Sequence, residues 1–193
     1  MKKFMYIIGI DEVGRGPLAG PVAVGAVCIR GEHQIKLKKL FPTIKDSKKL
    51  SPKKREEWLI KINEVRSEGW LEYTVAFVSP GVIDKNGLSY AIRTALEKAL
   101  NSIEHNPKEV KVLLDGGLHA PAEYLNQETI IKGDEKKLAI ALASIVAKVA
   151  RDKKMIALAK KLSQYGFEKH KGYGTRAHYT AIKKHGISIH HRK

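Results

Sequence analysis

Runs of apolar residues divide the chain into five candidate strands. Residues 4–11 combine aromatic and β-branched side chains with little polarity, which is typical of a central strand buried on both faces. Residues 21–29 form a second run so soon afterwards that we expect it to pair antiparallel with the first. Further strands are predicted at residues 70–78, 110–114 and 129–132. Because the first strands are consecutive and later ones alternate with helices, the pattern predicts an α/β fold, a mixed sheet with helices on its faces.

Helices between these strands are indicated by their ends and their spacing. Ser51-Pro52 is a good helix start, with serine as N-cap and proline in the first turn, and Gly69 ends a helix that runs to about Ser67. Ser79-Pro80 is a second helix start, which Gly87 interrupts. Residues 88–103 then carry apolar side chains at helical spacing, which predicts an amphipathic helix.

The C-terminal half is expected to be mostly helical. A short helix is predicted near residues 120–125, and Gly133-Asp134 opens a long helix that ends near Gly166. Its first half is apolar all round and should therefore be buried, whereas its second half is basic and amphipathic. A polar loop at residues 167–175 precedes a last helix that stops at Gly186, and residues 31–50 are expected to be irregular.

The composition fits one soluble domain over residues 1–193. Hydrophobic residues make up 43% of the 193, and no apolar run reaches the roughly 18 residues of a membrane span. The apolar run at the start is too short for a signal sequence, so we expect a cytoplasmic protein that does not bind a membrane. Cys28 is the only cysteine and lies in an apolar run, so it is interpreted as a small buried hydrophobe.

The charge balance changes the picture from an ordinary domain to one with a polyanionic partner. The chain has 36 Lys and Arg against 20 Asp and Glu, a formal net charge of +16. An excess this large favours binding to the phosphate backbone of a nucleic acid, although an inert basic surface would have the same composition.

Three acids follow strands and could converge on one point. Asp11 ends the first strand, Asp115 ends the fourth, and Asp134 follows the fifth. Ligands in open α/β sheets bind at strand ends, and an all-oxygen ligand set suits Mg²⁺ or Mn²⁺. On a basic protein, this indicates phosphodiester hydrolysis, in which two ions can act together. Glu12 would face the other side of a regular strand and joins the cluster only if the strand bends.

Each of these features also has a purely structural interpretation. Asp115-Gly116 is a common turn dipeptide, Asp134 could be a helix N-cap, and Asp11-Glu12 could be solvated. The turn at residues 14–16 lacks the ending of a P-loop, but its backbone could approach a ribose. The later histidines lack a tight metal-binding spacing and are expected to be solvated loop and tail residues: His170, His178, His190 and His191.

Together these motifs resemble the type 2 ribonuclease H (ribonuclease HII) family. The residues that carry the resemblance are Gly9-Ile10-Asp11-Glu12-Val13-Gly14-Arg15-Gly16-Pro17 with its continuation to Val22, residues 46–51, residues 114–116, residues 132–134 with 143–152, and residues 170–175. The resemblance implies a ribonuclease H-like mixed five-stranded sheet flanked by helices. It also implies two-metal cleavage of RNA paired with DNA, including incision 5′ of single ribonucleotides in duplex DNA, which leaves a 5′-phosphate and a 3′-hydroxyl.

The resemblance also implies roles for particular residues. Four carboxylates would be catalytic and hold Mn²⁺ or Mg²⁺: Asp11, Glu12, Asp115 and Asp134. Six residues would bind the substrate: Gly14, Arg15 and Gly16 at the ribose 2′-hydroxyl and the neighbouring phosphate, Tyr173 stacked on the sugar, and Lys48 and Lys148 near the backbone. Asp152, in contrast, is expected to be structural and to pair with a nearby lysine or arginine.

Two other functions are weighed against this one. The related type 3 ribonuclease H requires an RNA stretch and usually has an extra N-terminal domain, whereas the first motif begins here by residue 9. A non-catalytic nucleic-acid-binding module with the same fold would not need an intact acid set. We expect a monomer that acts on RNA–DNA hybrids or ribonucleotide-containing DNA, and the sequence does not support contact with a sliding clamp.

Overall fold

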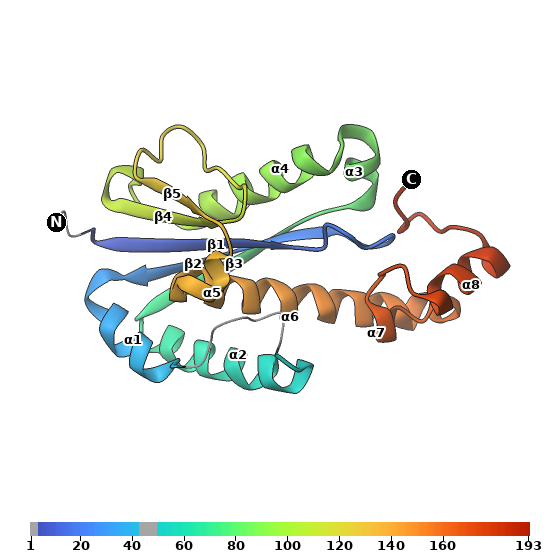
Figure 1. Cartoon of the computed structure of the whole chain (residues 1–193), viewed down its shortest axis with the longest axis horizontal. Helices are drawn as coiled ribbons and strands as arrows, with labels where there is room; N and C mark the ends of the chain where they lie inside the picture. The colour runs from blue at the N-terminus through green and yellow to red at the C-terminus, as the bar shows by residue number, and fades with distance from the viewer. Residues whose placement is uncertain (1–3, 43–49) are drawn as a thin grey trace.

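The computed structural model describes residues 4–42 and 50–193, and Lys48 lies outside them. Its centre is a five-stranded sheet in the order β3-β2-β1-β4-β5 (Figure 1). β1 pairs antiparallel with β2 and parallel with β4. β2 pairs antiparallel with β3, and β4 pairs parallel with β5. The mixed five-stranded sheet expected from the sequence is therefore confirmed. The strands are β1 Tyr6–Val13, β2 Val22–Arg30, β3 Leu71–Val78, β4 Val110–Asp115 and β5 Gln127–Ile130.

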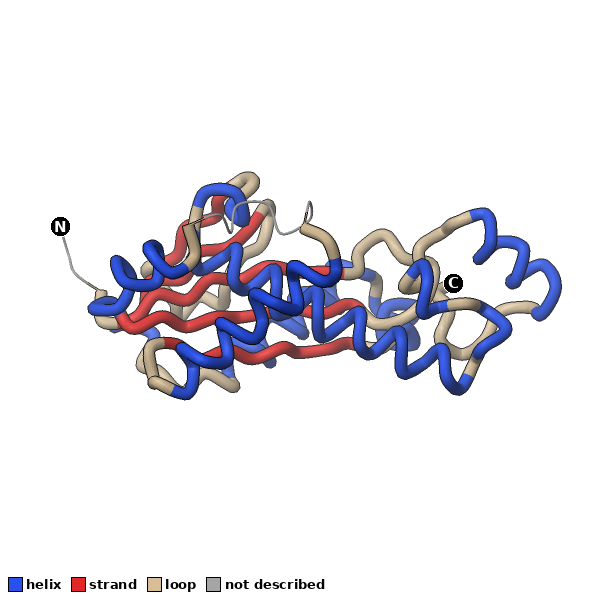
Figure 2. The backbone as a smooth tube through the Cα atoms, turned by 90° about the horizontal axis from the view of Figure 1, so that it is seen from below, coloured by secondary structure: helices blue, strands red, loops and turns tan. Residues whose placement is uncertain are grey.

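Helices cover both faces of this sheet. Helix α4 lies on one face with α3, and the long helix α6 crosses the other face with α2 outside it (Figure 1). Figure 2 shows that the end of α6 and the last helices extend beyond the strands. The α-helices are α1 Gln34–Leu40, α2 Pro52–Ser67, α3 Pro80–Asn86, α4 Leu88–Asn101, α5 Gly133–Lys136, α6 Leu138–Lys161, α7 Phe167–His170 and α8 Arg176–His185, and the short 3₁₀ helices are η1 Gly31–His33, η2 Pro107–Glu109 and η3 Ser163–Tyr165.

The alternating side chains of β1 contribute to a separate core on each side of the sheet. Ile8 and Ile10 pack into the core beneath α4, and Ile7 packs against the core beneath α6. Gly9 faces α6 so closely that a Cβ atom there would lie 2.1 Å from the Ala139 carbonyl carbon. Only a glycine permits this approach of helix and strand. The central position predicted for the first strand is confirmed, and it fixes α6 directly over the end of β1.

Helix α2 begins and ends as its sequence predicts. The Ser51 Oγ accepts a hydrogen bond from the Lys54 backbone N–H at 3.2 Å, with Pro52 in the first turn. Beyond its end at Ser67, Gly69 has a φ of +74°, a left-handed conformation that suits glycine. The amphipathic α4 is likewise present, with its apolar stripe buried against the sheet. Both helices are specified locally and then fixed by packing.

The lysine-rich stretch after β2 is more regular than the sequence indicated. Residues 34–40 form α1, although residues 31–50 were expected to be irregular. Leu37 is buried and Phe41, just beyond the helix, packs against the Trp58 ring with centroids 5.3 Å apart. Because these two apolar side chains anchor the segment while its lysines remain in solvent, packing stabilises a helix whose sequence is otherwise weakly patterned.

The predicted helix at residues 120–125 is absent and the segment is a series of turns. The Gln127 side chain accepts from the Ala120 N–H at 2.8 Å and donates to the Ala120 and Tyr124 carbonyls at 3.2 and 3.1 Å. These side-chain bonds replace the ones that a helix would provide. The next strand is also shifted, because it ends at Ile130 and Lys132 has a left-handed φ of +53°.

The long C-terminal helix is divided at its start and ends earlier than predicted. Lys137 has extended dihedral angles, which separate α5 from α6, and α6 ends at Lys161 instead of near Gly166. The apolar first half of α6 is buried as predicted. Residues 167–170, expected to be loop, form α7, because Phe167 is fully buried with Tyr165, Met155 and Ala159 in a small third core. The last helix stops at Gly186 as predicted.

Candidate active site

Strand pairing brings Asp11 and Asp115 together. The parallel pairing of β1 with β4 places Ile10 beside Leu114, so the next residues along, Asp11 and Asp115, are also neighbours. Both follow residues that point into the core beneath α4, so alternation directs both carboxylates to the α6 face. Both side chains are buried. Two acids that are 104 positions apart in the chain therefore share one end of the sheet.

Asp134 lies at the start of α5, next to a residue that is hydrogen-bonded to Asp115. The Gly133 backbone N–H donates to the Asp115 Oδ1 at 2.6 Å, which joins the end of β4 to the residue before Asp134. Asp134 is buried in the first turn of α5, whose N-cap position is Lys132, so it is not the helix cap that one interpretation proposed. The Asp115 carbonyl also accepts from the Leu118 N–H at 3.3 Å, so the turn interpretation of Asp115 is compatible with a role in this cluster.

Glu12 lies at the same end of β1 but by alternation on the opposite face. The pairing of β1 with β2 is unbroken through Glu12 and Val13, so the strand does not bend before Gly14, where φ is +94°. The Glu12 N–H donates to the Asp11 Oδ1 at 2.8 Å, and its Oε1 lies 3.0 Å from an Arg15 guanidinium nitrogen. Glu12 nevertheless remains close enough to Asp115 for that charge to affect it.

The environment of Glu12 fits a cation-binding carboxylate. Burial raises its pKa above the usual value, the nearby Arg15 lowers it, and the Asp115 charge contributes a further increase. Its Oε2 is buried without a hydrogen-bond partner. A divalent cation would offset the cost of burying this charged carboxylate and the cost of its unpartnered oxygen. The oxygen would coordinate the cation, and the cation would neutralise the nearby negative charges. Asp11, Asp115 and Asp134 offer oxygen donors, the type that suits Mg²⁺ or Mn²⁺, whereas β1 does not bend to bring Glu12 to their face, so Glu12 lies beside them from the opposite face. We call these four residues the acidic edge.

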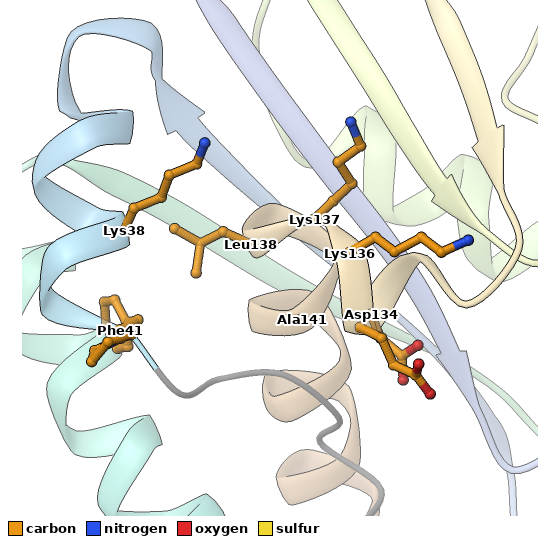
Figure 3. Close-up of a pocket in the computed structure, with 9 residues that line it drawn as sticks. Lys38, Phe41, Asp134, Lys136, Lys137, Leu138 and Ala141 are labelled. Carbon is orange, nitrogen blue, oxygen red and sulfur yellow. The ribbon is translucent and has the colours of Figure 1, made fainter.

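A shallow pocket of about 220 Å³ borders the acidic edge at Asp134. It is lined by residues of α1, α5 and the start of α6, and Figure 3 shows the Asp134 side chain directed away from Lys38 and Lys137. Lys38 and Lys137 therefore lie in the same pocket as Asp134 without pointing at its carboxylate. Positive charge beside a carboxylate cluster is the arrangement that draws a phosphate backbone toward bound cations.

The glycine turn after β1 contacts the loop that carries Tyr173. The Leu18 and Ala19 N–H groups both donate to the Gly172 carbonyl, at 2.8 and 3.3 Å. A Cβ atom on Gly16 would lie 3.9 Å from the Tyr173 ring. Tyr173 is 40% exposed, so its ring remains available beside the turn. The structure thus brings together Gly14, Arg15, Gly16 and Tyr173, which the sequence predicted as substrate-binding residues.

Lys148 lies in the same region and its charge is paired. Its Nζ lies 5.9 Å from the centre of the Tyr173 ring and 2.8 Å from the Asp152 Oδ1. Asp152 is also 3.8 Å from an Arg55 guanidinium nitrogen. The predicted structural role of Asp152, pairing with a lysine or arginine, is confirmed. Lys148 faces the tyrosine from α6, which is compatible with a position near a bound backbone.

Two arginines that sequence reasoning did not identify hold these loops in place. Arg151 has no exposed surface, and its guanidinium donates to the carbonyls of Pro21, Lys171 and Ala19 at 2.9, 3.1 and 3.2 Å. Arg192 binds the Gly20 carbonyl twice, at 3.0 and 2.9 Å. Burial lowers the pKa of Arg192 to about 10, so it still carries its charge at neutral pH. The basic composition alone gave no signal for this role.

The histidine expectation is wrong for His178 and His191, which are buried and bonded to each other. The His178 Nδ1 lies 2.9 Å from the Tyr173 carbonyl, so it must donate, which leaves Nε2 as an acceptor. The His191 Nδ1 accepts from the Ser188 N–H at 2.9 Å, so its Nε2 carries the hydrogen and donates to the His178 Nε2 at 3.1 Å. Both rings are therefore neutral, and they tie the chain end to Tyr173.

The pKa directions agree with this assignment. Burial lowers the pKa of both His178 and His191, and each is lowered further by a neighbouring histidine. The neighbour of His178 is His170, whose ring stacks on it with centroids 4.4 Å apart. The spacing of these histidines in the sequence hides their contact, because α8 and the tail fold back on each other only in the tertiary structure.

Comparisons with known proteins agree with this geometry. A family model described as Ribonuclease HII matches residues 8–192. The Ribonuclease HII of Endomicrobium trichonymphae is 44% identical over 191 residues, covering 99% of this chain and 85% of that protein. The crystal structure of ribonuclease H2 from Pyrococcus horikoshii OT3 has a TM-score of 0.76 and 27% identity, covering 97% of this chain and 92% of that one. A chain of the PCNA:RNase HII complex from Archaeoglobus fulgidus has a TM-score of 0.75 and 28% identity, covering 96% and 93%.

One further property concerns membranes. Within residues 4–42 and 50–193, no helix is both long enough and apolar enough to cross a bilayer.

Proposed function

Because the chain belongs to the ribonuclease HII family, it is a ribonuclease H, and we propose that it incises duplex DNA on the 5′ side of single embedded ribonucleotides as well as cutting the RNA strand of RNA–DNA hybrids. The observation that carries this proposal is that Asp11 and Asp115 are neighbours at one end of the sheet, with Asp115 bonded to the residue before Asp134, beside the turn that contacts Tyr173. Hydrolysis would leave a 5′-phosphate and a 3′-hydroxyl.

The acidic edge is the proposed catalytic centre. When bound there, two Mg²⁺ or Mn²⁺ ions would supply charge stabilisation for the attacking and leaving oxygens of the phosphodiester. Asp11 and Asp115 would hold the ions from the sheet, because strand pairing fixes both side chains. Asp134 would complete the set from α5, and Glu12 would use the buried oxygen that has no hydrogen-bond partner.

The glycine turn and Tyr173 are the proposed ribose sensor. Gly14, Arg15 and Gly16 would present backbone and guanidinium N–H groups to the 2′-hydroxyl and the neighbouring phosphate. Tyr173 would stack on the sugar at the RNA–DNA junction, and the exposed part of its ring supports this assignment. Lys148 would lie near the backbone. Lys48 would do the same, although it lies outside the described residues.

The cellular role follows from the chemistry of the substrate. Ribonucleotides embedded in duplex DNA are left by replication, so we place the activity in ribonucleotide excision repair and DNA replication in the cytoplasm. The net charge of +16 supports tight, salt-dependent binding to a duplex. The proposal includes a monomer and no sliding-clamp contact.

A cleavage assay tests the proposal. The substrate is an end-labelled DNA duplex with one ribonucleotide, supplied with Mg²⁺ or Mn²⁺. The expected product ends on the 5′ side of the ribonucleotide, and an all-deoxy duplex of the same sequence is the control. A hybrid with a continuous RNA strand is run in parallel, because an enzyme of the type 3 kind would cut only that substrate. No cleavage of the single-ribonucleotide duplex with either metal by a folded sample would overturn the proposal.

A further inference from the structure

A second group of metal-ligating side chains lies on the other face of the sheet from Asp11. It consists of Cys28, Glu72 and His105, whose ligand atoms all lie within 4.8 Å of one another. Cys28 on β2 and Glu72 on β3 are directly paired across the antiparallel strands. His105 comes from the segment between α4 and η2. The three ligands therefore come from three separate parts of the fold.

The cluster is also distant from the acidic edge along the strands. Cys28 pairs with Ile8, three residues before Asp11, which corresponds to about 10 Å along β1. Cys28 belongs to the core beneath α4, whereas Asp11 faces α6. A ligand bound at Cys28 would therefore not share a coordination sphere with a cation at Asp11.

The imidazole of His105 is already oriented toward the other two groups. Its ring stacks on Tyr6 with centroids 3.8 Å apart and an interplanar angle of 18°. Its Nε2 lies 2.7 Å from the Glu72 Oε1. The stack restricts rotation of the ring, so part of the entropy cost of ordering a ligand is met before anything binds.

The exposure of the three side chains leaves a route for a small ion. The Cys28 thiol is at the buried end, with the residue only 2% exposed. The His105 and Glu72 side chains, at 22% and 46%, lie between it and solvent. Zn²⁺ ligands in a tetrahedron, with bonds of about 2.0–2.3 Å, are roughly 3.3–3.8 Å apart. The ligand atoms here, all within 4.8 Å of one another with His105 and Glu72 at 2.7 Å, lie around that spacing.

We propose that Cys28, Glu72 and His105 form a binding site for a borderline transition-metal ion, of which Zn²⁺ is the best match, with water as the fourth ligand. Thiolate, imidazole and carboxylate are the three donor types that Zn²⁺ accepts, whereas Mg²⁺ selects oxygen donors. The site joins β2, β3 and the segment after α4, so its occupation stabilises that end of the sheet.

A titration with Co²⁺, a spectroscopic substitute for Zn²⁺, tests the site in the full chain. It is run with excess Mg²⁺, so that the acidic edge is supplied with its own type of ion. Because Cys28 is the only cysteine, a thiolate-to-Co²⁺ absorption band in the near ultraviolet reports this residue alone. We expect the band to saturate at one equivalent and to disappear when Zn²⁺ is added.

Three variants complete the test. C28A should abolish the band, and H105Q should weaken Co²⁺ binding at least tenfold. The matched control is H33Q, because His33 also has a glutamate neighbour, Glu32 at 3.4 Å, and stacks on Trp70. H33Q should bind like the wild type. No band in the wild type, or unchanged binding in folded H105Q, would overturn the proposal. H105Q alters a partly exposed side chain outside the strands, so it keeps the test decisive if C28A fails to fold.

Discussion

Asp11 and Asp115 occupy adjacent positions because regular strand pairing puts them there, whereas Tyr173 is held by side chains from distant segments. At the acidic edge, backbone hydrogen bonds of the sheet fix the functional groups. We call residues 151–193 the C-terminal unit. In this unit the loop that carries Tyr173, the tyrosine loop, depends on Arg151, His178 and His191. The comparison teaches that chemistry and substrate selection in one molecule can be supported by different kinds of interaction, and that mutations should separate them.

The largest expected effect separates catalysis from stability at the acidic edge. Asp115→Asn keeps the shape of the side chain but removes a charge that would hold a cation. Cleavage of the single-ribonucleotide duplex should fall by about 10²–10³-fold or more, the scale of losing one group that stabilises a transition state. Duplex binding measured by fluorescence anisotropy should be largely unchanged. An equal loss of binding and cleavage would contradict a catalytic role.

A change at Arg151 should do the reverse and act first on stability. Arg151→Ala leaves two buried carbonyl acceptors and a partly buried third without their donor, so the free energy of unfolding should drop by about 3 kcal/mol or more. Urea unfolding followed by circular dichroism measures this. Arg176→Ala on the exposed start of α8 is the control and should change stability by less than about 0.5 kcal/mol. Similar losses in the two variants would show that the buried hydrogen bonds contribute little.

A smaller effect is expected at Tyr173, where stacking is at stake and the fold is not. Tyr173→Ala should lower kcat/KM on the single-ribonucleotide substrate. The corresponding loss of transition-state stabilisation should be about 1–3 kcal/mol, the range for an aromatic ring stacked on a nucleotide base. Tyr173→Phe keeps the ring and should lose less. Steady-state kinetics on the single-ribonucleotide duplex and on a continuous hybrid give the comparison. If both substrates are affected equally, Tyr173 does not read the junction.

The smallest effect is a pH dependence in the C-terminal unit. The pKa values of His178 and His191 are lowered in the folded protein, so folding favours their neutral forms. The stability that they contribute is fully present above their ordinary pKa near 6.5 and is lost as pH falls through the lowered values. Urea unfolding at pH 7.5 and pH 5 should show this loss in the wild type.

A matched pair of variants isolates that contribution from other titrations. His191→Gln should reduce the difference in stability between the two pH values, because the buried imidazole pair is gone. His119→Gln, at an exposed histidine that does not act on the pair, should leave the difference unchanged. An unaltered pH dependence in His191→Gln would mean that the pair does not control acid stability.

The elements that sequence reasoning predicted well have local determinants. Ser51, Pro52 and Gly69 define α2, and periodic apolar residues define α4. Those that it missed depend on partners elsewhere. α1 requires the contact of Phe41 with Trp58, and residues 120–125 follow the side chain of Gln127 instead of forming a helix. Local sequence patterns do not contain these contacts. The prediction therefore followed the local helix propensity, which was too weak at α1 and misleading at residues 120–125.

The sequence alone determined the family, the mixed sheet and the positions of the acids at strand ends, because motifs and strand patterns are local and ordered along the chain. Only the tertiary structure decided that Glu12 stays on the opposite face of an unbroken strand and that His178 and His191 form a neutral pair. It also decided that Arg151 joins the turn after β1 to the tyrosine loop. Burial and hydrogen-bond partners set these properties, and the partners of Arg151 lie up to 132 positions away, beyond any pattern that neighbouring residues encode.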